Sequence, residues 1–418
     1  VKVKVTSSNI IIKSSQNFAK NYRKPLKENT EEWAKIMEKA LEYLRTHSHL
    51  IGRASKDAIF TAVFDGSVSL LDAYSRYSGP EQSRAERAKR SGFGGIGVVV
   101  KPVKRGALVI TVIESSPAIL AGIKTGDVIT HVDGTPVKDW GKGTLNDVFR
   151  GEIGSFIDVT VKRNNRNNLN FSLKREKVIL PTVKLTQKNR ILRIQVINFY
   201  QDTARQIESM VKDAIRTAEK PIAGMILDLR GNRGGILSQA IKVADLFLVN
   251  GRILTTWGRH LSSRKEYVAN TDDILAGRPL IVLTNGHSAS AAEIVAAALQ
   301  DHNRSIIVGT STFGKGLVQT VSQLPNDGEL TLTWSRFLTP SGYFVHDLGV
   351  PPNICTTGED VDAEKIVFKS LKDFSKFIQL MDAWQKVAVA NKQERSNLRE
   401  RCPASNKSPK VDIKIAEK

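Results

Sequence analysis

The sequence contains little cysteine, no long apolar run and fewer acidic than basic residues. Its 418 residues include two cysteines, Cys355 and Cys402, which lack the CxxC spacing and the neighbouring histidines of a zinc site. No stretch of about eighteen apolar residues occurs, so we expect no transmembrane segment. The remaining composition, 41% hydrophobic and 25% charged, is typical of a globular chain with room for roughly two to four domains.

The two cysteines allow one disulfide. In an oxidising compartment we expect Cys355 and Cys402 to be bridged. By the chain-entropy model, a bridge closing a loop of about fifty residues stabilises the fold by about 4 kcal/mol and ties the C-terminal tail to the core. The alternative is a pair of free thiols in a reducing cytosol.

The shortage of acidic residues leaves a net charge of +20 and a pI of about 9.8, which would attract any polyanion. The densest basic stretch, residues 162–177, surrounds an Asn-rich centre that predicts a hairpin turn. Its one aromatic residue, Phe171, is too little for base stacking. We therefore interpret the stretch as a solvated basic face and expect no nucleic-acid partner.

The chain divides into four segments, which together predict a multi-domain α+β and α/β protein. Residues 1–90 form a helical N-terminal module, because apolar residues recur at helical spacing from Thr30 and again from Ser55. Residues 91–180 are rich in glycine and β-branched residues and predict a small β-domain. In residues 181–358 strands alternate with helices, as in a largely parallel sheet. Residues 359–418 form a helical C-terminal tail.

The tail carries a periodic apolar stripe. Its members, which recur at intervals of three and four, are Val367, Leu371, Phe374, Ile378 and Met381. This spacing predicts one buried face of a helix.

The stretch from Gly309 to Lys315 has the glycine and lysine spacing of a nucleotide-binding P-loop. A P-loop continues with Ser or Thr and opens a helix, whereas here Gly316 follows and residues 317–324 predict a strand. We therefore expect no phosphate ligand, and Lys315 needs another role.

The β-domain contains a glycine-rich turn, Phe93, Gly94, Gly95, Ile96 and Gly97, whose backbone N–H groups could converge on a carboxylate. Downstream, residues 116–134 have the pattern S-P-A-x-x-A-G-x-x-x-G-D-x-I-x-x-V-D-G. This pattern resembles the PDZ domains of bacterial proteases. A generic β-domain with glycine turns is the alternative.

The chemistry is expected around Ser290. Ser290 and Glu293 have the spacing of a capping box, so Ser290 could simply begin a helix. A serine at a helix N-terminus can also be a nucleophile, since free amides there can hold an oxyanion. Neither His287 nor His302 lies in a recognisable triad context. A desolvated lysine can be the base instead, and Lys315 fits that need.

This Ser/Lys pairing resembles the carboxy-terminal processing, or tail-specific, proteases. The resemblance covers roughly residues 50–355, and its further motifs are S-A-S-A-x-E-I at 288–294, Gln300, Asp301 and Arg304, T-F-G-K-G-x-V-Q at 312–319, D-L-R-x-N-x-G-G at 228–235, and Thr339, Pro340, Gly342 and Gly349. Ala292 departs from it, because many members carry a serine there.

The resemblance implies a crotonase-like α/β core and a serine endopeptidase without metal or other cofactor. It makes Ser290 the nucleophile, Lys315 the general base and Gln319 the residue that orients the lysine. It places the oxyanion hole at the N–H of Ala291 and of Gly234 or Gly235, leaving open which glycine donates. The predicted PDZ domain would bind apolar substrate C-termini.

Two other functions stay open: a PDZ scaffold with a vestigial active site, and an acyl-CoA enzyme, since the crotonase fold also binds thioesters. The resemblance leaves an adaptor protein and self-association open as partners.

The compartment is predicted from three weaker indications. Family members are typically exported, the cysteine pair favours an oxidising space, and the chain begins at Val1 rather than at methionine. We expect a mature product, with its signal peptide removed, in the bacterial periplasm or cell envelope.

Overall fold

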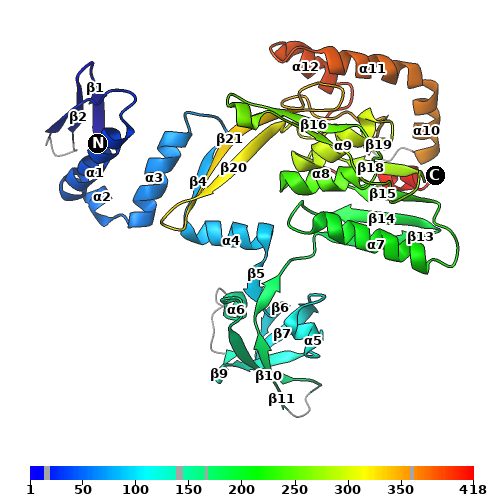
Figure 1. Ribbon diagram of the computed structural model, residues 1–418, viewed down its shortest axis with the longest axis horizontal. Helices are drawn as coiled ribbons and strands as arrows, with labels where there is room; N and C mark the ends of the chain where they lie inside the picture. The colour runs from blue at the N-terminus through cyan, green and yellow to red at the C-terminus, as the bar shows by residue number, and fades with distance from the viewer. Residues whose placement is uncertain (14–18, 138–144, 165–167, 358–361) are drawn as a thin grey trace. The chain divides into compact units, whose positions relative to one another are not determined.

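The computed structural model describes residues 1–13, 19–137, 145–164, 168–357 and 362–418. They form two compact units, whose elements are labelled in Figure 1. The first unit combines Val1–Ser83 with Val321–Leu332, and the second combines Arg84–Thr320 with Thr333–Lys418. No helix in the described part of the chain is long and apolar enough to cross a bilayer.

The first unit begins with a three-stranded antiparallel sheet in the order β1-β2-β3. Successive side chains of β2 point to opposite faces, so Ile10 and Ile12 lie on the same face. Both pack in a small core with Ala40 and Leu44 of α1. The predicted helices are present in this unit, but the sheet was not predicted. The elements are β1 (Lys2–Val5), β2 (Asn9–Lys13), β3 (Ala19–Arg23), α1 (Thr30–His47), α2 (His49–Arg53), α3 (Lys56–Val68) and β4 (Arg76–Ser78).

The second unit begins with the β-domain. Its antiparallel sheet has the order β11-β10-β8-β7-β6, so β6 is an edge strand. The pairing of β10 with β11 confirms the predicted hairpin, although residues 165–167 at its turn lie outside the described part. Helix α4 (Pro80–Ser91) precedes this domain and contains the boundary between the two units. The elements of the domain are β5 (Phe93–Gly95), β6 (Val98–Val103), β7 (Gly106–Val112), α5 (Pro117–Leu120), β8 (Val128–Val132), β9 (Thr135–Pro136), α6 (Leu145–Val148), β10 (Phe156–Lys162), β11 (Asn168–Lys174) and β12 (Glu176–Val178).

The following core is built on a six-stranded sheet in the order β13-β14-β15-β18-β19-β22, parallel except for β13. Leu227 and Val282 face one side with the helices α7, α8 and α9, while Ile226 and Leu283 face the other. The predicted α/β core is confirmed. The elements of the sheet and its helices are β13 (Val183–Lys188), β14 (Ile191–Val196), α7 (Thr203–Thr217), β15 (Gly224–Asp228), α8 (Leu237–Asp245), β18 (Leu280–Thr284), α9 (Ala291–Asp301), β19 (Ile306–Gly309) and β22 (Ile354–Cys355).

A second sheet has the strand order β17-β16-β21-β20. Along the sequence, its strands lie between strands of the core sheet. Strand β21 also pairs with β4 through residues 329–331. Its elements are β16 (Arg252–Trp257), the 3-10 helix η2 (Leu261–Ser263), β17 (Lys265–Val268), β20 (Leu317–Gln323) and β21 (Glu329–Leu338).

The tail is helical, as predicted, but most of its apolar stripe is not buried. The exposed fractions of Leu371, Phe374 and Ile378 are 70%, 57% and 55%. The stripe is interrupted at Asp373, where one helix ends and the next begins. Val367 of the stripe packs against a core cluster, and the tail also contacts the core through residues outside the stripe, among them Trp384 and Ile415. Its helices are α10 (Ala363–Lys372), α11 (Phe374–Lys386), α12 (Lys392–Arg399) and α13 (Lys410–Ala416).

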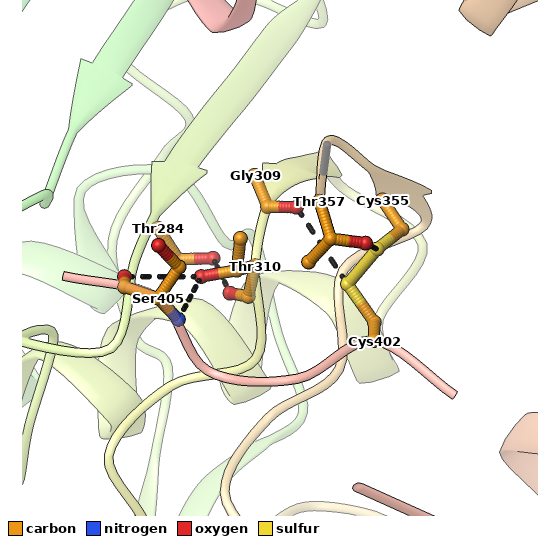
Figure 2. Close-up of a disulfide and its surroundings, with 7 residues drawn as sticks. All are labelled: Thr284, Gly309, Thr310, Cys355, Thr357, Cys402 and Ser405. Atoms are coloured by element: carbon orange, nitrogen blue, oxygen red, sulfur yellow. Dashed lines mark hydrogen bonds between the residues drawn. A yellow bond between two sulfur atoms is a disulfide. The ribbon is translucent and has the colours of Figure 1, made fainter. Parts of the chain in front are cut away.

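A disulfide joins the tail to the core sheet, as predicted for an oxidising compartment. Cys355 of β22 is bonded to Cys402, which follows α12 (Figure 2). Three residues beyond the bridge, the backbone N–H of Ser405 donates a hydrogen bond to the Thr310 hydroxyl at 3.2 Å. The tail is therefore held next to the end of β19, where the loop leading to Lys315 begins.

Candidate active site

Ser290 lies at the N-terminus of α9, immediately before Ala291. Its backbone φ is +55°, a left-handed value that is unusual for a serine. The helix behind it is buried from Ala291 to Gln300, whereas Ser290 itself is half-buried. Strained backbone of this kind persists where the surroundings fix it, and it turns the serine out of the helical path.

The segment before Ser290 is fixed from the loop that follows β15. Ala289 donates its N–H to the carbonyl of Asn232 at 2.9 Å, and the Ser288 hydroxyl donates to the carbonyl of Leu229 at 2.8 Å. The Asn232 side chain is fully buried and donates in turn to the Val196 carbonyl. The predicted glycine loop and the predicted nucleophile are therefore parts of one hydrogen-bonded assembly.

Glu293 connects the Ser290 segment to the Lys315 segment. Its carboxylate is fully buried and accepts four hydrogen bonds from side-chain and backbone donors. Oε2 accepts the N–H groups of Ser290 and Lys315 at 2.7 and 2.8 Å. Oε1 accepts the Thr312 hydroxyl at 2.5 Å and the Gly314 N–H at 2.6 Å.

Burial raises the pKa of the Glu293 carboxyl, while the four donated hydrogen bonds act in the opposite direction. The sequence pattern predicts Glu293 only as a capping residue for α9. Its bonds to residues 312, 314 and 315 were missed, because the capping pattern contains no information about a loop about twenty residues downstream.

Lys315 and Gln319 lie within hydrogen-bonding distance of each other. The Lys315 Nζ donates to Gln319 Oε1 at 2.9 Å. Strand β20 begins at Leu317, as predicted, so the glycine-rich loop does not open a helix as a P-loop does. At Gly316 an added Cβ would lie 2.3 Å from the backbone nitrogen of His346, so only glycine fits beside the lysine.

Gly234 lies directly against Ser290. A Cβ added to Gly234 would lie 2.9 Å from the Ser290 Cβ and 3.1 Å from the Ala291 nitrogen. The Gly234 N–H donates to the Asn232 Oδ1 at 2.8 Å, so it is already engaged. Among the described residues, no acceptor receives the N–H of Gly235 or of Ala291.

An ion cluster lies at the end of β15, where the glycine loop begins. Asp228 is buried and accepts hydrogen bonds from Arg193 at 2.6 Å and from Arg230 at 2.8 Å. Burial acts to raise the pKa of the Asp228 carboxyl, but the two guanidinium groups outweigh it and lower the pKa. Arg230 also pairs with Asp412 of α13 at 2.9 Å, which ties the tail to this loop.

The predicted carboxylate-binding turn differs in part from the expectation. Phe93, Gly94 and Gly95 form β5 and pair with β12, so these residues are not an open turn. Ile96 is fully buried, and its carbonyl accepts the Ala118 N–H. Gly97 has a φ of +81°, and a Cβ there would meet the Ser116 Cβ at 2.1 Å. The loop that leads into the edge strand β6 is therefore short and fixed.

No group of three or more His, Cys, Asp or Glu residues that could hold a metal ion occurs in the described part of the chain.

Comparison with known proteins agrees with the site and with the domain order. Residues 190–356 match the model of peptidase family S41, and residues 94–174 match the model of the PDZ domain. The chain is 36% identical over 293 residues to a carboxy-terminal-processing protease of Bartonella bacilliformis, covering 69% of this chain and 68% of that protein.

Two further relatives extend the comparison. The chain is 33% identical to the carboxy-terminal processing protease CtpA of Bacillus subtilis, over 76% of this chain and 68% of that protein. Among solved structures, it is similar to a photosystem II D1 C-terminal processing protease, with 27% sequence identity and a TM-score of 0.43, over 81% of this chain and 90% of that one. By the two family models and the two sequence relatives, the chain belongs to peptidase family S41 and is a PDZ-containing serine protease of the C-terminal processing group.

Proposed function

We propose that the chain cleaves peptide bonds with Ser290 as nucleophile and Lys315 as general base, oriented by Gln319. The observation that carries this proposal is the shared Glu293 oxygen, which holds the backbones of Ser290 and Lys315, together with the Lys315–Gln319 hydrogen bond. Two segments 25 residues apart in the sequence are in this way held at one place.

The reaction is acyl transfer in two steps. Neutral Lys315 accepts the proton of the Ser290 hydroxyl as Oγ attacks the carbonyl carbon, and the resulting ammonium protonates the leaving amine. Water then attacks the acyl carbonyl carbon while Lys315 accepts a proton from the water. The bond to Ser290 Oγ breaks, and the Lys315 ammonium returns the proton to Oγ. The Gln319 side-chain oxygen accepts a hydrogen bond from Nζ and so fixes the direction in which the lysine lone pair points.

The oxyanion would be held by the N–H groups of Ala291 and Gly235. The Gly234 N–H is bonded to Asn232, which favours Gly235 as the donor from this pair. The contribution of Gly234 is its missing side chain, because a Cβ would occupy the space beside Ser290 and the Ala291 nitrogen. A donor of this kind is worth about 3–4 kcal/mol of transition-state stabilisation.

The PDZ domain would select substrates by their C-terminus. Strand β6 is the edge of its sheet and can accept an extended peptide as an added strand. At the start of β6, the Gly97 N–H has no acceptor in the described part of the chain and is available to a terminal carboxylate. A preference for an apolar last residue stays a prediction from the resemblance to PDZ-containing tail-specific proteases.

The substrates would be proteins of the bacterial cell envelope, with the chain itself in the periplasm. The Cys355–Cys402 bridge supports an oxidising compartment. An adaptor protein and self-association remain predictions.

The test uses an unfolded reporter protein with an apolar tail and intact-mass analysis of its fragments. The parent should cleave it, Ser290→Ala and Lys315→Ala should not, and amidation of the tail carboxylate should slow cleavage. Cleavage by Ser290→Ala at the parental rate would refute the catalytic assignment. Failure of the parent to cleave, with no labelling of Ser290 by a fluorophosphonate, would favour the scaffold alternative.

A further inference from the structure

Helix α12 reaches the lysine loop from outside the peptidase core. It spans Lys392–Arg399, beyond residues 190–356 that match the family model. Two of its arginines, Arg395 and Arg399, are four residues apart and therefore lie on one face of the helix. Both donate to backbone carbonyls of the core, as described next.

Arg399 joins the lysine loop to the segment 344–349. Its Nη2 donates to the carbonyl of Thr312 at 3.2 Å, and its Nη1 donates to the carbonyl of Leu348 at 2.5 Å. A Cβ at Gly314 would lie 3.3 Å from this Nη1. The guanidinium therefore contacts the backbone of the loop that leads into Lys315.

Arg395 anchors the second segment. It is almost fully buried, with 3% of its surface exposed, and its Nη2 donates to the carbonyls of Phe344, at 3.0 Å, and His346. The segment it holds is bonded to the lysine loop itself, because Asp347 donates its N–H to Gly314 at 2.9 Å. The two arginines therefore fix both partners of one backbone contact next to the lysine.

Its charge and the directions of its donors both suit a guanidinium to this bridging position. Burial lowers the pKa of Arg399, but the carboxylates of Glu293 and Asp347 act in the opposite direction and favour its charged form. Its planar fork offers several donors in fixed directions, so it can bond two segments at once, which a lysine ammonium does less well.

We infer that Arg399 is a positioning residue of this peptidase, which fixes the loop carrying Lys315 by joining it to residues 344–349 from the C-terminal tail. This inference rests on the proposed role of Lys315 as the base. It makes the tail part of the catalytic apparatus, acting through the loop backbone and without contact to substrate. The disulfide at Cys402, three residues beyond Arg399, keeps α12 in place.

The experiment compares Arg399→Gln and Arg399→Lys with the parent and with Arg401→Gln. Arg401 is exposed and two residues away, so it is a matched control for loss of one tail charge. Each protein is titrated with a fluorophosphonate to count reactive Ser290 sites, and kcat is then expressed per titrated site. We expect Arg399→Gln to lose about 10- to 100-fold in kcat per site with KM nearly unchanged, because small misplacements of catalytic groups have effects of this size.

Arg399→Lys should recover part of the loss, and Arg401→Gln should match the parent. The inference is overturned if Arg399→Gln turns over at the parental rate per site. It is also overturned if only the number of titratable sites falls, since that result indicates a folding role. Failure of the proposed function is distinct: the parent would then neither cleave nor label at Ser290, and the inference would fall with it.

Discussion

The backbone amides of Ser290 and Lys315 donate to the same oxygen atom, Oε2 of Glu293, at 2.7 and 2.8 Å. A single fully buried carboxylate thus sets the separation of two segments that the sequence places far apart. Hydrogen bonds to a buried charged acceptor are stronger than neutral ones. The distance between the proposed nucleophile and the proposed base is therefore fixed through the backbone, before any substrate binds.

Replacing Glu293 by Gln should impair this arrangement with little change in shape. An amide nitrogen cannot accept the donors that meet at either oxygen, which are two N–H groups at Oε2 and a hydroxyl and an N–H at Oε1, so two buried donors lose their acceptor. We expect a loss of about 1–3 kcal/mol in the free energy of unfolding for each unsatisfied donor, and a fall in kcat. Urea unfolding and cleavage kinetics measure the two effects.

The matched control is Glu266→Gln, a change at an exposed side chain of β17. It should leave both quantities near the parental values. Parental kcat in Glu293→Gln would contradict the positioning role assigned to this carboxylate.

Gln319→Glu should change the pH dependence of cleavage. The substitution places a carboxylate where the amide oxygen now accepts the Lys315 Nζ at 2.9 Å. An adjacent negative charge stabilises the ammonium form of the lysine. Since the base must be neutral, the acidic limb of the kcat/KM profile should move to higher pH.

Gln319→Ala is the comparison for that profile. It removes the orienting group without adding charge, so the rate should fall while the acidic limb moves less than in Gln319→Glu. A profile of Gln319→Glu that coincides with the parental one would show that this side chain does not act on the base.

Gly234→Ala should abolish cleavage. The added Cβ would lie 2.8 Å from the Ala289 carbonyl oxygen and 2.9 Å from the Ser290 Cβ, and the residue has a φ of +100°. Gly231→Ala is the control, because its φ is also positive, at +78°, but nothing lies within 4 Å of the added Cβ. Backbone strain alone costs about 1–2 kcal/mol, so equal kcat values for the two variants would argue against crowding at Ser290.

Acid should weaken the fold through Asp228. The folded-state pKa of this carboxyl lies below its ordinary value of 3.8, so its contribution is present above that value and is lost as the pH falls through the folded pKa. Asp228→Asn should lower the free energy of unfolding at neutral pH by about 3–5 kcal/mol, because it removes the buried carboxylate that pairs with Arg193 and Arg230 and leaves Arg230 with Asp412 alone.

The difference between the parent and Asp228→Asn should shrink below pH 3.8, as the parental carboxyl is protonated too. Urea unfolding over a pH series measures it. A difference that stays constant into acid would mean that the charge of Asp228 does not stabilise the fold.

The sequence predicted the fold class and the PDZ domain well, since glycine spacing and strand–helix alternation are local signals. The predictions failed where contacts between residues far apart in the sequence determine the structure. The stripe has helical spacing, yet Leu371 and Phe374 are exposed. Two features of the site were also not predicted: the Gly234 N–H donates to Asn232, and Glu293 accepts a hydrogen bond from the lysine loop. Both depend on tertiary contacts, which no local pattern encodes.

With a protein tail bound to the PDZ domain as proposed, the edge strand β6 would limit the length of tail that can pair with it. The strand runs Val98–Val103, but Pro102 has no backbone N–H to offer an incoming strand. Backbone pairing can therefore extend from the Gly97 end only as far as the residues before Pro102. A recognition tag for this protease would be a few residues long, so many unrelated proteins could acquire or lose one by a single substitution at their last position.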